Sequence, residues 1–265
     1  MGSTCHNATV GPDHILQRLK AIRDPRMRVL ALVEAFGKGD PGTWVELLEA
    51  ILTRAHRVDD PDALMAVEVI NHAAADPALA YESRKDMYVA ATERGMPAIA
   101  RLFLSVSPNV VPDAQLKKQL APERALKPSG RALTLGERKS LARTHLREQI
   151  LLLLRDPHPA VVGILLENPH VTESDILRIA SNRPAVPEAL AKIASHPRWS
   201  VRHPVKRALV MNPATPLADA IRIVTTLRIT ELAELSVDPM LPELLRRHCA
   251  ELHAASQQQR RRPSA

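Results

Sequence analysis

The sequence predicts an all-α protein: a right-handed α-solenoid of stacked helical hairpins, in which two repeat arrays are joined by a basic linker. Three observations predict this fold: an excess of proline over glycine, Asp-Pro pairs at regular intervals, and a second set of Asn-Pro repeats. The 265 residues include 22 prolines, 9 glycines and only six aromatic residues. Average usage would give about 13 prolines and about 19 glycines. The chain is therefore rich in proline, which marks the starts of helices, and poor in glycine, which the turns of β-hairpins need. This composition excludes an all-β fold.

The first array is expected over residues 13–114. Pro25, Pro61 and Pro97 lie 36 residues apart, as do Pro41 and Pro77. Proline suits the first position of a helix, and a preceding aspartate caps the free amides, so each Asp-Pro pair is expected to begin a helix. The spacing predicts hairpins with first helices over 26–36, 62–74 and 98–106 and second helices over 43–56 and 79–94.

Apolar residues are expected to occupy matching buried positions in successive hairpins of this array. These matches are Leu30, Ala66 and Leu102 in the first helices, and Ile51 with Met87, Leu52 with Tyr88 and Ala55 with Ala91 in the second helices.

A basic linker and helix are expected over residues 115–147. Residues 114–147 carry nine basic and two acidic side chains, so the formal charge of +7 is local to this segment. A loop is predicted over 121–132, followed by a helix that opens at Thr134 with a Thr134–Glu137 capping box. The candidate basic site consists of Lys117, Lys118, Arg124, Lys127, Arg131, Arg138 and Lys139.

The second array is expected over residues 148–253. Residues 168–181, 182–195 and 212–225 are three copies of one pattern that opens on Asn and continues into a short helix. Arg178, Lys192 and Arg222 share one position of the pattern and are predicted to form a basic ladder, if the repeats stack regularly. Three further candidates for partner binding lie nearby: Arg202, Lys206 and Arg228.

Residues 150–235 resemble the leucine-rich repeat variant family of bacterial α-solenoids, which is related to HEAT repeats. The similar features are a His-Pro step, Val201-Arg202, an apolar helix and an Asn-Pro-x-Thr-Pro turn at 212–216. The resemblance implies short stacked helices wound into a superhelix. Pro204 departs from the pattern and is expected to kink its helix or delay its start. Some members hold an iron–sulfur cluster, but this chain has two cysteines, fewer than the four ligands a cluster needs.

No catalytic residue, metal site or cofactor is predicted. His248, Cys249 and His253 share a predicted helix, and Cys249 and His253 could face one metal ion. Two ligands do not make a zinc site, so we expect a surface histidine and a small buried cysteine here. Trp199 is expected to be an aromatic wedge between repeats. The alternative for Trp199 is a groove residue, as in helical-repeat DNA glycosylases.

The two ends of the chain, 1–12 and the basic tail 254–265, are expected to be disordered. The N-terminus lacks the basic and apolar regions of a secretory signal, and no apolar run approaches the length of a membrane span. A cytoplasmic location is therefore expected.

Two functions remain open for such a chain. The first is a non-enzymatic scaffold or adaptor that binds a protein or an acidic peptide on the concave face of the solenoid. The second is a nucleic-acid-binding solenoid that contacts phosphates through its basic residues. Six aromatic residues offer little material for stacking bases, which favours the first function.

Overall fold

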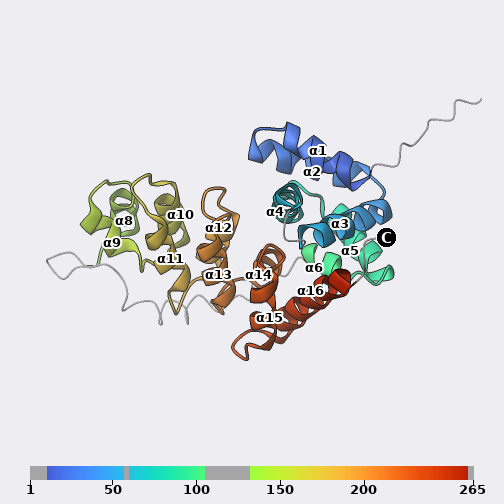
Figure 1. Ribbon diagram of the computed structural model, residues 1–265. Coiled ribbons are helices and arrows are strands. Elements are labelled where there is room, and N and C mark those ends of the chain that lie inside the picture. Colours follow the sequence, from blue (N-terminus) through green and yellow to red (C-terminus); the bar gives the residue numbers. More distant parts are fainter. Residues whose placement is uncertain (1–10, 57–59, 105–131, 262–265) are drawn as a thin grey trace, which may run out of the picture. The chain divides into compact units, whose positions relative to one another are not determined.

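The computed structural model describes residues 11–56, 60–104 and 132–261, which form fifteen α-helices (Figure 1). The all-α prediction is confirmed for this part of the chain. The helices divide into two compact units. The first unit covers the chain to Leu104 together with residues from Leu252 onward, and the second covers Ser105–Glu251.

Three helices of the first unit begin at the predicted Asp-Pro pairs. In each, the aspartate carboxylate accepts a hydrogen bond from the backbone N–H three residues further on, at 2.7–3.0 Å. A fourth helix begins at Pro97 without a side-chain cap. The helices are α1 (Pro12–Ala21), α2 (Pro25–Lys38), α3 (Pro41–Ala55), α4 (Pro61–Ala75), α5 (Tyr81–Glu93) and α6 (Pro97–Leu102).

The Asp76-Pro77 pair does not begin a helix, contrary to the prediction. The Asp76 carboxylate accepts a hydrogen bond from the backbone N–H of Ala78 at 2.9 Å, and its carbonyl accepts one from Leu79 at 3.0 Å. The pair therefore forms a turn. An aspartate side chain that accepts a hydrogen bond from the backbone N–H two residues ahead stabilises a turn, whereas the three capping aspartates accept from the N–H three residues ahead. As a result, α5 begins only at Tyr81.

In the first unit, α2 packs on α4 and α3 on α5, and the consecutive helices α3 and α4, and α5 and α6, also pack on each other. Met87, Ala91 and Leu102 are buried as predicted. Two register positions are wrong, since Leu30 and Tyr88 are exposed. In α2, the neighbouring Val29 and Val33 face the core, so Leu30 points outward.

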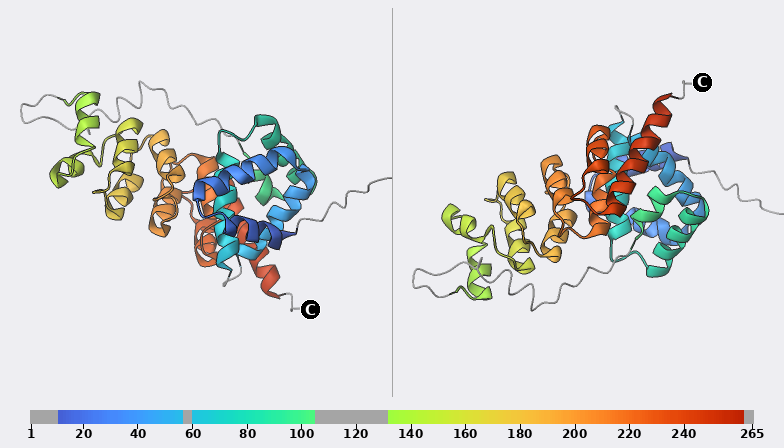
Figure 2. Two further views of the ribbon diagram at one scale, coloured as in Figure 1. Left: turned by 90° about the horizontal axis from the view of Figure 1, so that it is seen from above. Right: turned by 90° about the horizontal axis from the view of Figure 1, so that it is seen from below.

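In the described part of the second unit, eight helices alternate between two rows and are followed by the first half of α16 (Figure 2). The first row is α8 (Leu135–Leu141), α10 (Pro159–Glu167), α12 (Pro187–Ser195) and α14 (Leu217–Val224). The second row is α9 (Arg147–Leu153), α11 (Glu173–Ser181), α13 (His203–Met211) and α15 (Ile229–Val237). In the first row, each helix packs on the next helix of the row, and α11 packs on α13 in the second.

The sequence copies do not coincide with this two-row period. Residues 168–181 and 182–195 are adjacent copies, but their helices α11 and α12 belong to different rows. The structural period is a hairpin of two helices. The number of residues in one hairpin can be measured between successive N-caps of the second row. These N-caps are residues 146, 172, 202 and 228, so one hairpin takes 26 to 30 residues.

Two local predictions have clear outcomes in this unit. Thr134 opens α8 with the predicted capping box, in which its hydroxyl accepts a hydrogen bond from the Glu137 N–H at 3.3 Å. Pro204 does not lie inside its helix as the pattern predicted, because α13 begins at His203 and holds the proline in its first turn, where no backbone donor is required.

The C-terminal tail is helical where we expected disorder. The last helix, α16, runs from Glu243 to Arg261, so residues 254–261 continue a helix. Leu252 and Ser256 are buried along it, and Ala, Leu, Gln and Arg are strong helix formers. At the other end, Gly11 and Pro12 of the predicted disordered segment 1–12 form the N-cap and first residue of α1. Residues 1–10 and 262–265 lie outside the described residues.

Candidate functional site

Buried asparagines join successive hairpins of the second unit. The side-chain amide of Asn168 donates to the carbonyls of Ala142 and Thr144, both at 2.9 Å. Asn212 does the same to Ala180 at 2.7 Å and Asn182 at 3.0 Å. Both side chains belong to the Asn-Pro turns of the sequence pattern, so the recurring asparagine is the sequence signal for these bonds. Their role in joining repeats was not predicted.

Capping acids form a second set of links between hairpins. Asp175 caps α11, is buried, and accepts two hydrogen bonds from the Arg147 guanidinium at 2.5 and 2.6 Å. Burial acts to raise the pKa of the Asp175 carboxyl, but hydrogen bonds from Arg147 and Thr172 outweigh it and lower the pKa to about 2. Glu231 caps α15 in the same way and contacts His203 at 3.0 Å. These charged groups are therefore used to hold the stack together.

The predicted basic ladder is divided between the two rows of helices. Arg178 is exposed on α11 in the second row, and Lys192 is exposed on α12 in the first row. Arg222 is largely buried, with 11% of its side chain exposed, and it donates to Asp219 at 3.1 Å. Adjacent copies of a hairpin-forming sequence alternate between rows, which is why the shared position does not produce one ladder.

The other three candidates near the ladder differ in their accessibility. Arg202 is exposed at the N-cap of α13, where its nearest carboxylate, that of Glu173, is 3.9 Å away. Arg228 is exposed at the N-cap of α15. Lys206 is buried. Arg178, Lys192, Arg202 and Arg228 thus remain as the accessible cations of the predicted site.

The candidate basic segment is described only in part. Arg138 is buried and donates to both carboxylate oxygens of Asp156 at 2.6 Å, which makes it part of the core of α8. Lys139 is half-buried. The remaining members lie outside the described residues: Lys117, Lys118, Arg124, Lys127 and Arg131.

The histidine and cysteine positions of α16 do not assemble a metal site. The described residues contain no group of three or more His, Cys, Asp or Glu side chains that could hold a metal ion. Burial raises the pKa of the Cys249 thiol to about 12, so the thiolate is scarce at neutral pH. His248 is buried and is not the surface residue expected.

Trp199 is buried between hairpins, as expected for a wedge. Its indole N–H donates to the Leu166 carbonyl at 2.9 Å, and the guanidinium of Arg198 lies 4.2 Å from the ring centroid. The ring is therefore unavailable to stack on a nucleobase.

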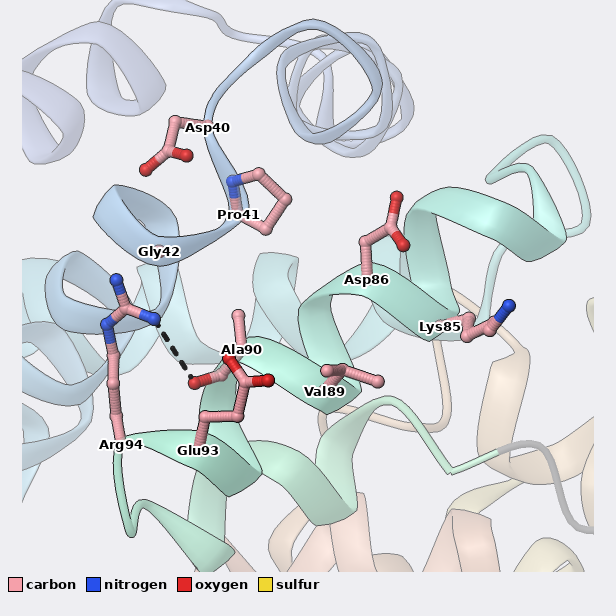
Figure 3. A pocket seen from close by; sticks show the side chains of 9 residues that line it. All are labelled: Asp40, Pro41, Gly42, Lys85, Asp86, Val89, Ala90, Glu93 and Arg94. Atoms are coloured by element: carbon pink, nitrogen blue, oxygen red, sulfur yellow. Dashed lines mark hydrogen bonds between the residues drawn. The ribbon is translucent and has the colours of Figure 1, made fainter.

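Two cavities of the first unit lie beside the N-terminus of α3, and neither was predicted. The smaller cavity, about 470 Å³, lies between α3 and α5 (Figure 3). The guanidinium of Arg94 covers Gly42 and donates to the Ala90 carbonyl at 3.4 Å. Asp40 accepts the Thr43 N–H at 2.7 Å, and this bond lowers the pKa of its carboxyl. Asp40 and Arg94 thus serve to cap and to cover the N-terminus of α3.

The larger cavity, about 740 Å³, lies among α1, α2 and α3. Its apolar lining includes Leu19, Leu32 and Trp44. Lys38 at its edge pairs with Glu34 at 2.5 Å, and this hydrogen bond lowers the pKa of the Glu34 carboxyl. The cavity has the volume of a small-molecule pocket.

No protein-family model, curated protein or solved structure matches this chain. In the described residues, no helix combines the length and the apolar character that crossing a membrane requires.

Proposed function

We propose that the chain is a non-enzymatic, cytoplasmic scaffold or adaptor built as a right-handed α-solenoid, and that it binds a protein or acidic peptide on a concave face. The two rows of short helices in the second unit support the solenoid. The asparagine and capping-acid links that recur between hairpins also support it, since each hairpin of a solenoid is held by its neighbours. The resemblance to leucine-rich repeat variant proteins agrees with this proposal.

One observation favours an acidic partner: Arg178 and Arg202 are exposed on neighbouring helices of the second row. Glu173, at 3.9 Å from Arg202, is beyond good hydrogen-bond distance, so the guanidinium can take a better acceptor. Arg178 makes no ion pair with another described residue. Guanidinium groups bind carboxylates through paired, charge-assisted hydrogen bonds, which suits an acidic peptide laid across α11 and α13.

A protein ligand is favoured over nucleic acid by the placement of the aromatic side chains. Trp199, the one aromatic residue of the second unit, is buried, and the exposed tyrosines Tyr81 and Tyr88 belong to the first unit. Binding to single strands relies on exposed aromatic platforms beside the basic groups. Duplex DNA, bound through phosphates alone, remains the alternative partner.

The test is a fluorescence-anisotropy titration of the full chain with a labelled glutamate-rich peptide. The double variant Arg178→Glu/Arg202→Glu should weaken binding by about tenfold or more, because each hydrogen bond to a charged group contributes about 1.5–3 kcal/mol. Arg18→Glu/Arg23→Glu, which reverses two exposed arginines of the first unit, is the matched control and should bind normally. Unchanged circular dichroism of the variants establishes that the fold is intact.

Two results would contradict the proposal. The first is a wild-type chain that does not bind the peptide at about 50 mM salt, where charge contacts are strong. The second is mixed-sequence duplex DNA that binds more tightly than the peptide, with an affinity that falls steeply as salt is added. That second result would establish the nucleic-acid function instead.

A further inference from the structure

One side of α9 exposes two leucines between an acid and a base. Glu148, Leu151 and Leu152 are on one side of α9, since both leucines follow Glu148 at helical spacings of three and four residues, and Arg155 lies in the turn directly after the helix. All four are exposed, with Leu151 at 41% and Leu152 at 46%. The core of the unit packs on the opposite side of the helix, which carries Ile150 and Leu153. The two leucines therefore lie on the outer surface.

The same two positions are occupied differently in the other helices of the second row. Counted from the N-cap, residues five and six are Leu151 and Leu152 in α9. The corresponding pairs are Leu177 with Arg178 in α11, Arg207 with Ala208 in α13, and Ala233 with Glu234 in α15. Each of those pairs includes a charged residue. Only α9 thus has two leucines and no charge at this pair of positions, as at a protein interface.

The arrangement on α9 is complementary to itself. A two-fold axis that passes between Leu151 and Leu152 would bring each leucine against the other leucine of a second, antiparallel copy. The same axis would place Glu148 opposite Arg155 of the second copy, and Arg155 opposite Glu148. Interfaces with two-fold symmetry use one patch twice in this reciprocal way. Neither Glu148 nor Arg155 forms an ion pair with another residue in the described part of the chain, so both charges are available.

We propose that this side of α9 binds a second copy of the chain, and that the protein forms an antiparallel, two-fold symmetric dimer. The leucines form the apolar centre of the contact, and two Glu148–Arg155 pairs flank it and set the direction. A patch on one short helix gives an interface at the small end of the known range, below about 1,200 Å² in total, so the dimer is reversible. This inference is independent of the acidic ligand proposed for α11 and α13.

Sedimentation velocity of the full chain, from about 10 to about 500 µM, tests the dimer in the range expected for so small a contact. Leu151→Ser/Leu152→Ser should be monomeric throughout this range. Glu148→Arg and Arg155→Glu should each weaken association by about fivefold or more, because symmetry places two like-charged pairs in the contact. The double variant Glu148→Arg/Arg155→Glu restores both opposite-charge pairs and should dimerise like the wild type.

Mixing the two single variants provides the most specific readout. Glu148→Arg presents only bases and Arg155→Glu only acids, so an equimolar mixture should form a heterodimer, although each variant alone is mainly monomeric. A wild-type chain that stays monomeric at every concentration would overturn the proposal. Dimers that persist unchanged in both single variants, or a mixture that fails to associate, would place any self-association on another surface and overturn it equally.

Discussion

Asp175 shows how one side chain can hold two hairpins together. It caps α11 through Thr172 and receives the Arg147 guanidinium from α9, 28 residues earlier in the chain. A buried carboxylate is stable only when its hydrogen bonds compensate for the loss of water, and here they do so well enough to lower its pKa to about 2. The Asp175 charge is therefore a structural element of the repeat stack.

Replacing Asp175 with Asn should lower the free energy of unfolding by about 2 kcal/mol at neutral pH, since one unit of pKa corresponds to about 1.4 kcal/mol. The pKa of this carboxyl is lower in the folded state than in the unfolded state. Its contribution is therefore complete above the ordinary aspartate range and is lost as pH falls toward about 2. Urea unfolding at pH 7, 4 and 3 measures the difference, which should shrink in the acid samples.

Glu188→Gln is the control for this prediction, because it removes an exposed carboxylate from α12 and should change the stability by less than about 0.5 kcal/mol. A difference between wild type and Asp175→Asn that stays constant down to pH 3 would show that the Arg147 link does not depend on the charge.

The asparagines that link hairpins allow a second prediction about single side chains. Asn212 is buried and donates to two carbonyls of the preceding hairpin, whereas Asn182 is half-buried and donates to the Leu154 carbonyl. Asn212→Ala leaves buried acceptors without donors and should cost about 2–3 kcal/mol, against about 1 kcal/mol for Asn182→Ala. Equal losses in thermal or urea unfolding would contradict the stronger link that the two hydrogen bonds of Asn212 are expected to make.

Among the helices of the first unit, the starts could be predicted well from local chemistry. A cap and a proline act within one turn, so Asp24, Asp40 and Asp60 could be recognised without any knowledge of the fold. Asp76 has the same neighbour, but its carboxylate closes a turn. The choice between a cap and a turn depends on how the following helix packs. Leu30 is exposed for a related reason, since tertiary packing sets the rotation of α2.

Two glycines near the end of α2 give a matched test of this packing. A methyl group added at Gly37 meets nothing within 4 Å, whereas one added at Gly39 would lie 2.1 Å from the Trp44 indole nitrogen. Gly37→Ala should raise the stability by about 0.5–1 kcal/mol, because alanine favours a helix. Gly39→Ala should lower it by about 1–3 kcal/mol, as expected for overpacking, and alter Trp44 fluorescence. Effects of the same sign at both positions would contradict the packing of Trp44 on Gly39.

For the whole molecule, the sequence predicts the all-α class better than it predicts which residues make up one hairpin of the second unit. The three similar copies in the second half, at 168–181, 182–195 and 212–225, do not mark the hairpin boundaries. The structure pairs the helices into hairpins, and adjacent copies lie in different rows. The candidate site changes for this reason: Arg178 and Lys192 lie in different rows and Arg222 is largely buried. Burial and row membership depend on contacts between residues about one hairpin apart, which a local pattern does not contain.

The most direct test of the proposed function is hydrogen exchange, followed by mass spectrometry, of the full chain with and without a saturating glutamate-rich peptide. Binding across the second row should slow amide exchange in α11 and α13, since a bound ligand suppresses local opening of the segments it contacts. The amides of α1 to α6 should exchange at unchanged rates. Slower exchange confined to α1 to α6, or no change in α11 and α13 under saturating peptide, would contradict an acidic-ligand site on the second unit.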